Sequence, residues 1–152
     1  MRKKWIAGLL AALALSLGGC SSAPEDVDID KLAAELAEKV SFTDELAQID
    51  DGMISMVYDG LTWEDAVLYM GSGATAEEVA VFAFTDAKAA RMAVQEGKAH
   101  IESQKGAFEN YVPEEVKRLE GAIVQQGGRY MAVVVTEDTD TADQILKDYH
   151  FK

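Results

Sequence analysis

The fold follows from one stretch, Ala122-Ile123-Val124-Gln125-Gln126-Gly127-Gly128-Arg129-Tyr130-Met131-Ala132-Val133-Val134-Val135-Thr136. Two runs that favour strands flank a pair of glycines, which is typical of a β-hairpin with its turn at Gly127-Gly128. The second run is apolar on both faces. We therefore expect it to lie in the centre of a sheet.

Two more strands are predicted upstream of this hairpin, at Trp63 to Met70 and at Glu78 to Thr85. The segment between them, Gly71 to Ala76, has the G-x-G-x-x-A spacing of a dinucleotide-binding loop. That motif must open a helix, whereas the residues that follow here favour a strand. The neighbouring carboxylates of Glu77 and Glu78 would also repel a phosphate, so we expect a hairpin connection.

Helical spacing and capping residues predict the helices. A long amphipathic helix begins after Asp86 and continues to about Tyr111, with Gly97 on its apolar face, where a strand can approach closely. Four shorter helices are expected: about Lys31 to Val40 after a cap at Asp28 or Asp30, Met53 to Tyr58, Pro113 to Gly121, and Thr141 to Tyr149. Ser41 to Ile49 has features of both a helix and a strand and stays unassigned.

These elements predict the fold class α+β. The expected structure is a mostly antiparallel sheet of about four strands with the helices packed on one face, in the order α-(α)-β-β-α-α-β-β-α.

The amino-terminal residues predict export and lipidation. Met1-Arg2-Lys3-Lys4 precedes an uncharged apolar run from Trp5 to Leu17, which is the layout of a secretory signal and too short for a membrane span. Leu17-Gly18-Gly19-Cys20 resembles the lipobox of bacterial lipoproteins, which implies cleavage before Cys20 and lipid on its thiol. The alternatives are ordinary secretion with a cut after Ala23, or an uncleaved anchor.

The resulting organisation is a lipoprotein signal peptide over residues 1–19, a lipid-anchored tether over 20–27 and a single α+β domain over 28–152. The tether reaches no more than roughly 25 Å. We therefore expect the domain to lie close to the extracytoplasmic face of the cell membrane.

The charge restricts the partners. The whole chain has 14 basic and 27 acidic residues, and the leader holds three of the basic ones, so the mature chain would carry 11 against 27, or −16. This charge argues against nucleic acid as a partner. An envelope protein or a cationic partner fits it better.

No residue or motif in the sequence predicts a catalytic, cofactor or metal site. Cys20 is the only cysteine, and no Ser-His-Asp or Cys-His set, HExxH motif or phosphate loop is evident, so we expect no catalytic residue, no cofactor and no metal ligand. The alternating aspartates at Asp26 to Asp30 do not continue as an EF-hand loop. His100 with Glu96 one turn earlier has the spacing to share a metal or a proton, but an exposed pair on the helix surface is the expectation.

Four motifs stand out together: the lipobox leader, the Gly-Ser loop into Ala76-Glu77-Glu78-Val79-Ala80-Val81-Phe82, the helix from Asp86, and Phe108-Glu109-Asn110-Tyr111-Val112-Pro113-Glu114-Glu115 before an Ile-Val strand. In these motifs the chain resembles an uncharacterised family of short Gram-positive lipoproteins, domain of unknown function 4358. The resemblance covers roughly residues 28 to 148. It implies an α+β fold and a place at the membrane, and it brings no known activity.

The expected function is a non-catalytic binding or accessory module at the outer face of the membrane. One alternative is a cation-binding module that uses the acidic N-terminal half. The other is a cell-wall glycan hydrolase that uses two carboxylates about 5 to 9 Å apart.

Overall fold

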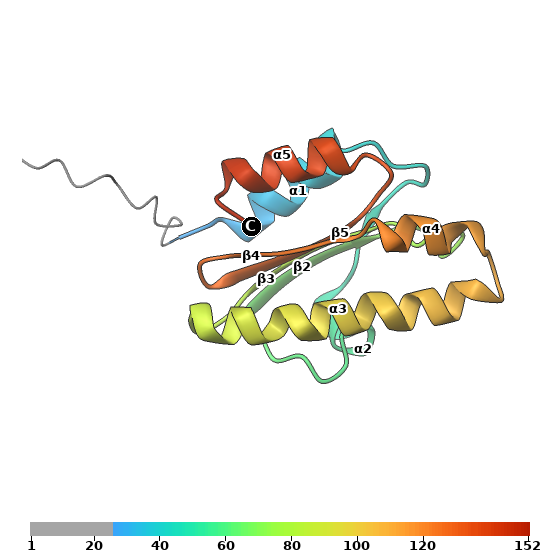
Figure 1. The fold of residues 1–152 in the computed structure, drawn as a ribbon. Coiled ribbons are helices and arrows are strands. Elements are labelled where there is room, and N and C mark those ends of the chain that lie inside the picture. The colour runs from blue at the N-terminus through green and yellow to red at the C-terminus, as the bar shows by residue number, and fades with distance from the viewer. Residues whose placement is uncertain (1–25) are drawn as a thin grey trace, which may run out of the picture.

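The computed structural model describes residues 26–152, which form three layers (Figure 1). A five-stranded sheet lies in the middle. Helices α1 and α5 cover one face, and α2, α3 and α4 cover the other. The elements in chain order are α1 (Ile29–Lys39), β1 (Ala47–Gln48), α2 (Asp51–Val57), β2 (Asp65–Met70), β3 (Glu78–Ala83), α3 (Ala87–Glu109), α4 (Glu114–Glu120), β4 (Ile123–Gly127), β5 (Tyr130–Val135) and α5 (Thr139–Asp148).

The sheet is antiparallel throughout, in the order β1-β2-β3-β5-β4. The α+β prediction is confirmed, but the sheet has five strands where about four were expected. The additional strand, β1, lies in the segment that the sequence left unassigned. It has only two residues, both exposed, and is too short to show an alternating pattern.

The prediction that helices cover one face is wrong. Every residue of β3 and of β5 is buried, and side chains that alternate along these strands enter two separate cores. A strand that is apolar on both faces needs an apolar cover on each of them. The central position predicted for β5 is confirmed, and that position is the reason for the three layers.

The turn of the β4–β5 hairpin lies one residue later than predicted. Gly127 is still in the strand, paired with Tyr130, and the turn is Gly128-Arg129, with φ of +56° at Gly128. Gly127 is needed for a different reason. A Cβ there would lie 2.8 Å from the Phe151 ring, so the glycine makes room for that side chain.

The predicted caps at Asp28 and Asp86 and the close approach at Gly97 are confirmed, whereas α1, α2 and α5 each begin about two residues earlier than predicted. Asp28 accepts a hydrogen bond from the Lys31 backbone N–H (2.9 Å), and Asp86 accepts one from Ala89 (2.8 Å). A Cβ on Gly97 would lie 3.0 Å from the Val124 side chain on β4 and 3.1 Å from the Met131 sulfur on β5.

The first described residues are tied to the hairpin turn. The Val27 backbone N–H donates to the Tyr130 hydroxyl (3.0 Å), the Val27 side chain is buried, and Asp26 lies 3.9 Å from the Arg129 guanidinium. Residues 26–152 therefore contain the whole sheet and both cores, and this part can fold as one unit.

Candidate functional site

A buried carboxylate lies where β3 meets the α2–α3 layer. Side chains alternate along a strand, so Glu78 points to the same face as Ala80 and Phe82, which is the face that α2 and α3 cover. Its side chain is 2% exposed. A carboxylate at such a position requires hydrogen-bond donors.

Two aromatic residues contact the oxygens of Glu78. Tyr58, at the end of α2, donates its hydroxyl to one oxygen of Glu78, and His100 Nε2 on α3 lies 3.0 Å from the other oxygen. The Tyr58 and His100 rings stack with their centroids 4.1 Å apart, and Tyr58 meets Phe82 edge-on at 4.8 Å. The three polar groups thus form one network that joins α2, β3 and α3.

The electrostatics of this network keep Tyr58 protonated. Burial raises the pKa of Tyr58 well above its ordinary value, and the charge and hydrogen bond of Glu78 raise it further. A tyrosine held neutral in this way donates a hydrogen bond and does not act as a base. Its role in the network is to satisfy the buried carboxylate.

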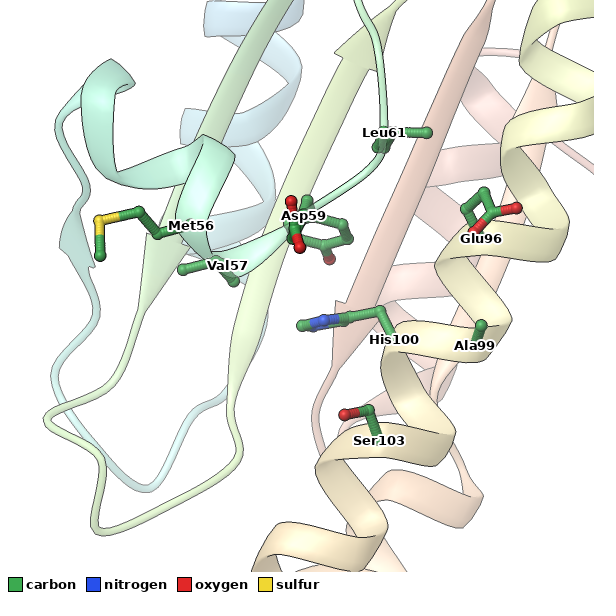
Figure 2. Close-up of a pocket in the computed structure, with 9 residues that line it drawn as sticks. Met56, Val57, Asp59, Leu61, Glu96, Ala99, His100 and Ser103 are labelled. Carbon is green, nitrogen blue, oxygen red and sulfur yellow. The ribbon is translucent and has the colours of Figure 1, made fainter.

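A hollow of about 360 Å³ opens beside the network (Figure 2). His100 extends into it from α3, toward the end of α2, while Ser103 lies one turn further along the same helix. Among the described residues, no hydrogen bond joins Ser103 to His100. The two side chains therefore do not form a nucleophile–base pair.

A second hollow, of about 480 Å³, adjoins the first, since Leu61 and Glu96 line both. The second hollow runs beside Phe84, Ala89 and Met92. We call the two together the α2–α3 groove. Its lining residues are Met56, Val57, Tyr58, Asp59, Gly60, Leu61, Thr62, Phe84, Ala89, Met92, Ala93, Gln95, Glu96, Ala99, His100 and Ser103.

A second buried polar cluster joins the loop after α1 to α4. Glu77 accepts hydrogen bonds from the backbone N–H groups of Thr43 and Asp44, each at 2.8 Å. Arg118 pairs with Glu115, and its Nε lies 3.7 Å from Glu77. These partners tie down the loop that leads into β1.

The acidic neighbours of Arg118 keep its guanidinium charged. Burial lowers the pKa of Arg118, but its hydrogen bond to Glu115 and the charges of Glu77, Glu115 and Glu137 outweigh that effect and raise the pKa overall. The Ala76 backbone N–H also donates to Glu115 (2.8 Å). The carboxylates here are engaged in holding backbone and guanidinium groups.

The structure changes the interpretation of His100. We expected an exposed pair with Glu96, and this was wrong, because the His100 side chain is 7% exposed and its partner is Glu78. Spacing along the helix could suggest only Glu96. Glu78 is 22 residues away in sequence, and only the packing of α3 on the sheet brings it near.

The other candidate residues are placed as follows. Gly71 to Ala76 forms the loop between the antiparallel strands β2 and β3, as expected for a hairpin connection. Cys20, the predicted lipidation site, lies outside the described residues, as do the signal peptide and nearly all of the tether. Within residues 26–152, no group of three or more His, Asp or Glu side chains is arranged to hold a metal ion. The same part of the chain contains no helix with the length and hydropathy of a membrane span.

One of three comparisons with known proteins gave a match. The model of the family described as "Domain of unknown function (DUF4358)" matches residues 38–136. That range includes the whole sheet and the network of Tyr58, Glu78 and His100. No curated protein and no solved structure matches the chain.

Proposed function

Because the chain belongs to the DUF4358 family, a family defined by a domain of unknown function, we propose a role from its own residues. The protein is a lipid-anchored binding or accessory module without catalytic activity. It is held at the extracytoplasmic face of the cell membrane by lipid on Cys20.

One observation carries the non-catalytic part of this proposal. Glu78 is buried, and its two oxygens are engaged by the Tyr58 hydroxyl and by His100 Nε2, so the groups beside the groove that are able to do acid–base chemistry are already paired through Glu78. A general base or nucleophile must instead reach a substrate. The α2–α3 groove therefore supports binding better than turnover.

Placement at the membrane rests on the sequence. The apolar leader, the lipobox at Leu17 to Cys20 and the short tether favour an anchored protein. The acidic charge of the domain favours an envelope protein or another cationic partner and disfavours nucleic acid.

The anchor is tested by mass spectrometry of the native protein together with cell fractionation. We expect a diacylglyceryl group on Cys20 and the protein in the membrane fraction, and we expect Cys20→Ser to release it. An unmodified Cys20, or wild-type protein in the cytosol, would refute the anchored role.

Catalysis is tested on purified residues 26–152 with a panel of peptide, ester and cell-wall glycan substrates. We expect no turnover. Hydrolysis of a glycan that is abolished by Asp59→Asn or Glu96→Gln, in variants that melt like the wild type, would establish the glycan hydrolase alternative, since these two carboxylates line the groove. Heat from Ca²⁺ binding in calorimetry would establish the cation-binding one.

A further inference from the structure

We propose that the α2–α3 groove binds a basic, amphipathic helical segment of a partner protein. This inference rests on the proposed function and specifies its surface and its partner.

The first observation is the distribution of exposed apolar side chains. Among the described residues, four large hydrophobic side chains are exposed, and three of them are methionines next to the groove: Met53 (52%) and Met56 (77%) on α2, and Met92 (65%) on α3. Methionine is flexible and polarisable, and it is common on surfaces that receive apolar helix faces. Met56 lines the first hollow and Met92 the second, and Met53 lies one turn before Met56 on α2, so exposed apolar side chains occur along both parts of the groove, which is typical of an interaction site.

The second observation is the charge of the groove. Its charged lining residues are Asp59 and Glu96, both acidic, and Asp50 and Asp51 are exposed at the start of α2. The basic residues of α3 that precede His100 are Lys88, Arg91 and Lys98, and none of them lines either hollow. The second hollow is mainly apolar and is bordered by Glu96, and the first, more polar hollow adds Asp59. Apolar surface next to carboxylates is complementary to a helix with one apolar face and basic flanks.

The same charge disfavours direct insertion into an anionic bilayer, because Asp59 and Glu96 would face lipid head groups of like charge. We therefore assign the exposed methionines to a protein partner rather than to lipid.

The third observation is the position of the groove relative to the start of the domain. Phe84 lines the groove, its backbone N–H donates to the Arg129 carbonyl (2.9 Å), and Arg129 donates back to the Phe84 carbonyl (3.0 Å). Asp26 and Val27 are tied to Arg129 and Tyr130. One end of the groove thus lies where the tether joins the domain, within reach of a partner in the membrane.

The test measures peptide binding to residues 26–152 by fluorescence anisotropy. The probe is a helical peptide of about 18 leucines and lysines, with leucines spaced three and four residues apart. Two comparison peptides are used, one with glutamate in place of lysine and one with the same composition in scrambled order. We expect the ordered lysine peptide to bind at least about tenfold more tightly than either.

Matched variants locate the site. Met56→Gln with Met92→Gln is expected to weaken binding about tenfold without changing net charge. The control is Tyr111→Gln, which removes the fourth exposed large side chain (69% exposed) beyond the end of α3, and is expected to change binding less than about twofold. Thermal melting confirms that each variant is folded.

A second pair tests charge. Asp59→Asn with Glu96→Gln is expected to weaken binding about threefold or more and to flatten its dependence on salt. Asp30→Asn with Glu38→Gln removes the same charge from α1, on the opposite face of the sheet, and is expected to have little effect.

Four results would overturn the proposal: no binding of the lysine peptide, equal binding of the scrambled one, unchanged binding by the methionine variant, or binding of residues 26–152 to anionic vesicles through the same methionines. None of these results would remove lipid from Cys20 or reveal turnover, so failure of the docking proposal is distinguishable from failure of the proposed function.

Discussion

Replacing Tyr58 by phenylalanine is expected to lower the free energy of unfolding by about 2 kcal/mol. The substitution removes only the hydroxyl that donates to Glu78, and it keeps the stack on His100 and the edge contact with Phe82. A hydrogen bond to a charged group contributes about 1.5 to 3 kcal/mol to stability. Glu78 is buried, so the loss leaves one of its oxygens without its protein donor, which is costly for a buried carboxylate.

Urea unfolding of residues 26–152 measures this effect. Tyr111→Phe is the matched control, since Tyr111 is 69% exposed, and it is expected to change stability by less than about 0.5 kcal/mol. Repeating Tyr58→Phe in a Glu78→Gln background tests the charge. The cost is then expected to fall to about 1 kcal/mol, the value of a neutral hydrogen bond.

Two outcomes would contradict this reasoning. If Tyr58→Phe costs no more than Tyr111→Phe, the buried carboxylate does not depend on the tyrosine. If the cost is the same in both backgrounds, the charge of Glu78 does not strengthen the bond.

Three further predictions follow from other parts of the structure. Gly97→Ala is expected to destabilise the protein by up to about 2 kcal/mol in urea unfolding, because overpacking against the Val124 and Met131 side chains costs about 1 to 3 kcal/mol and the gain in helix propensity is about 1 kcal/mol. A more stable variant would show that these side chains shift to make room. Hydrogen bonds from the Ser41 backbone and, next in size, from Thr141 hold the pKa of Asp138 below its usual range. The contribution of Asp138 to stability is therefore present above about pH 5 and lost as pH falls through the folded-state pKa. Asp138→Asn is expected to make the urea midpoint less sensitive to acid, and an unchanged acid profile would exclude this role. Burial and the hydrogen bond to Glu35 raise the pKa of Tyr149 to about 12, so the contribution of Tyr149 to stability is present below about pH 10 and lost as pH rises through about 12. Tyr149→Phe is expected to reduce alkaline destabilisation and to remove one late-titrating phenol from the ultraviolet absorbance titration. A wild-type titration curve for this variant would refute the assignment.

The strands and helices of this fold are predictable where their pattern is local. The apolar run of β5 predicts a central strand, and Asp28 and Asp86 predict helix starts, because each signal lies within a few residues. The same β5 pattern also contains the evidence for helices on both faces, since its odd and even residues are equally apolar. The two-residue strand β1 has no such pattern and depends on pairing with β2.

The candidate site is not predictable in the same way. Tyr58, Glu78 and His100 come from three elements, and no spacing rule connects them. The position of Glu78 at the start of an alternating strand does predict which face it occupies. Its donors follow only from the way α2 and α3 pack over that face.

The edges of the sheet bear on how copies of this protein behave when they are crowded together. On one side, β1 offers only two residues for pairing, and on the other, Gln126 of β4 exchanges two backbone hydrogen bonds with Lys152, at 3.2 and 3.0 Å. An edge with few free N–H and C=O groups is a poor template for a strand from another molecule. The domain is therefore expected not to aggregate through its sheet edges at high local concentration. A fusion joined at Lys152 that broke the two hydrogen bonds to Gln126 would expose the edge of β4 and promote fibrous aggregation.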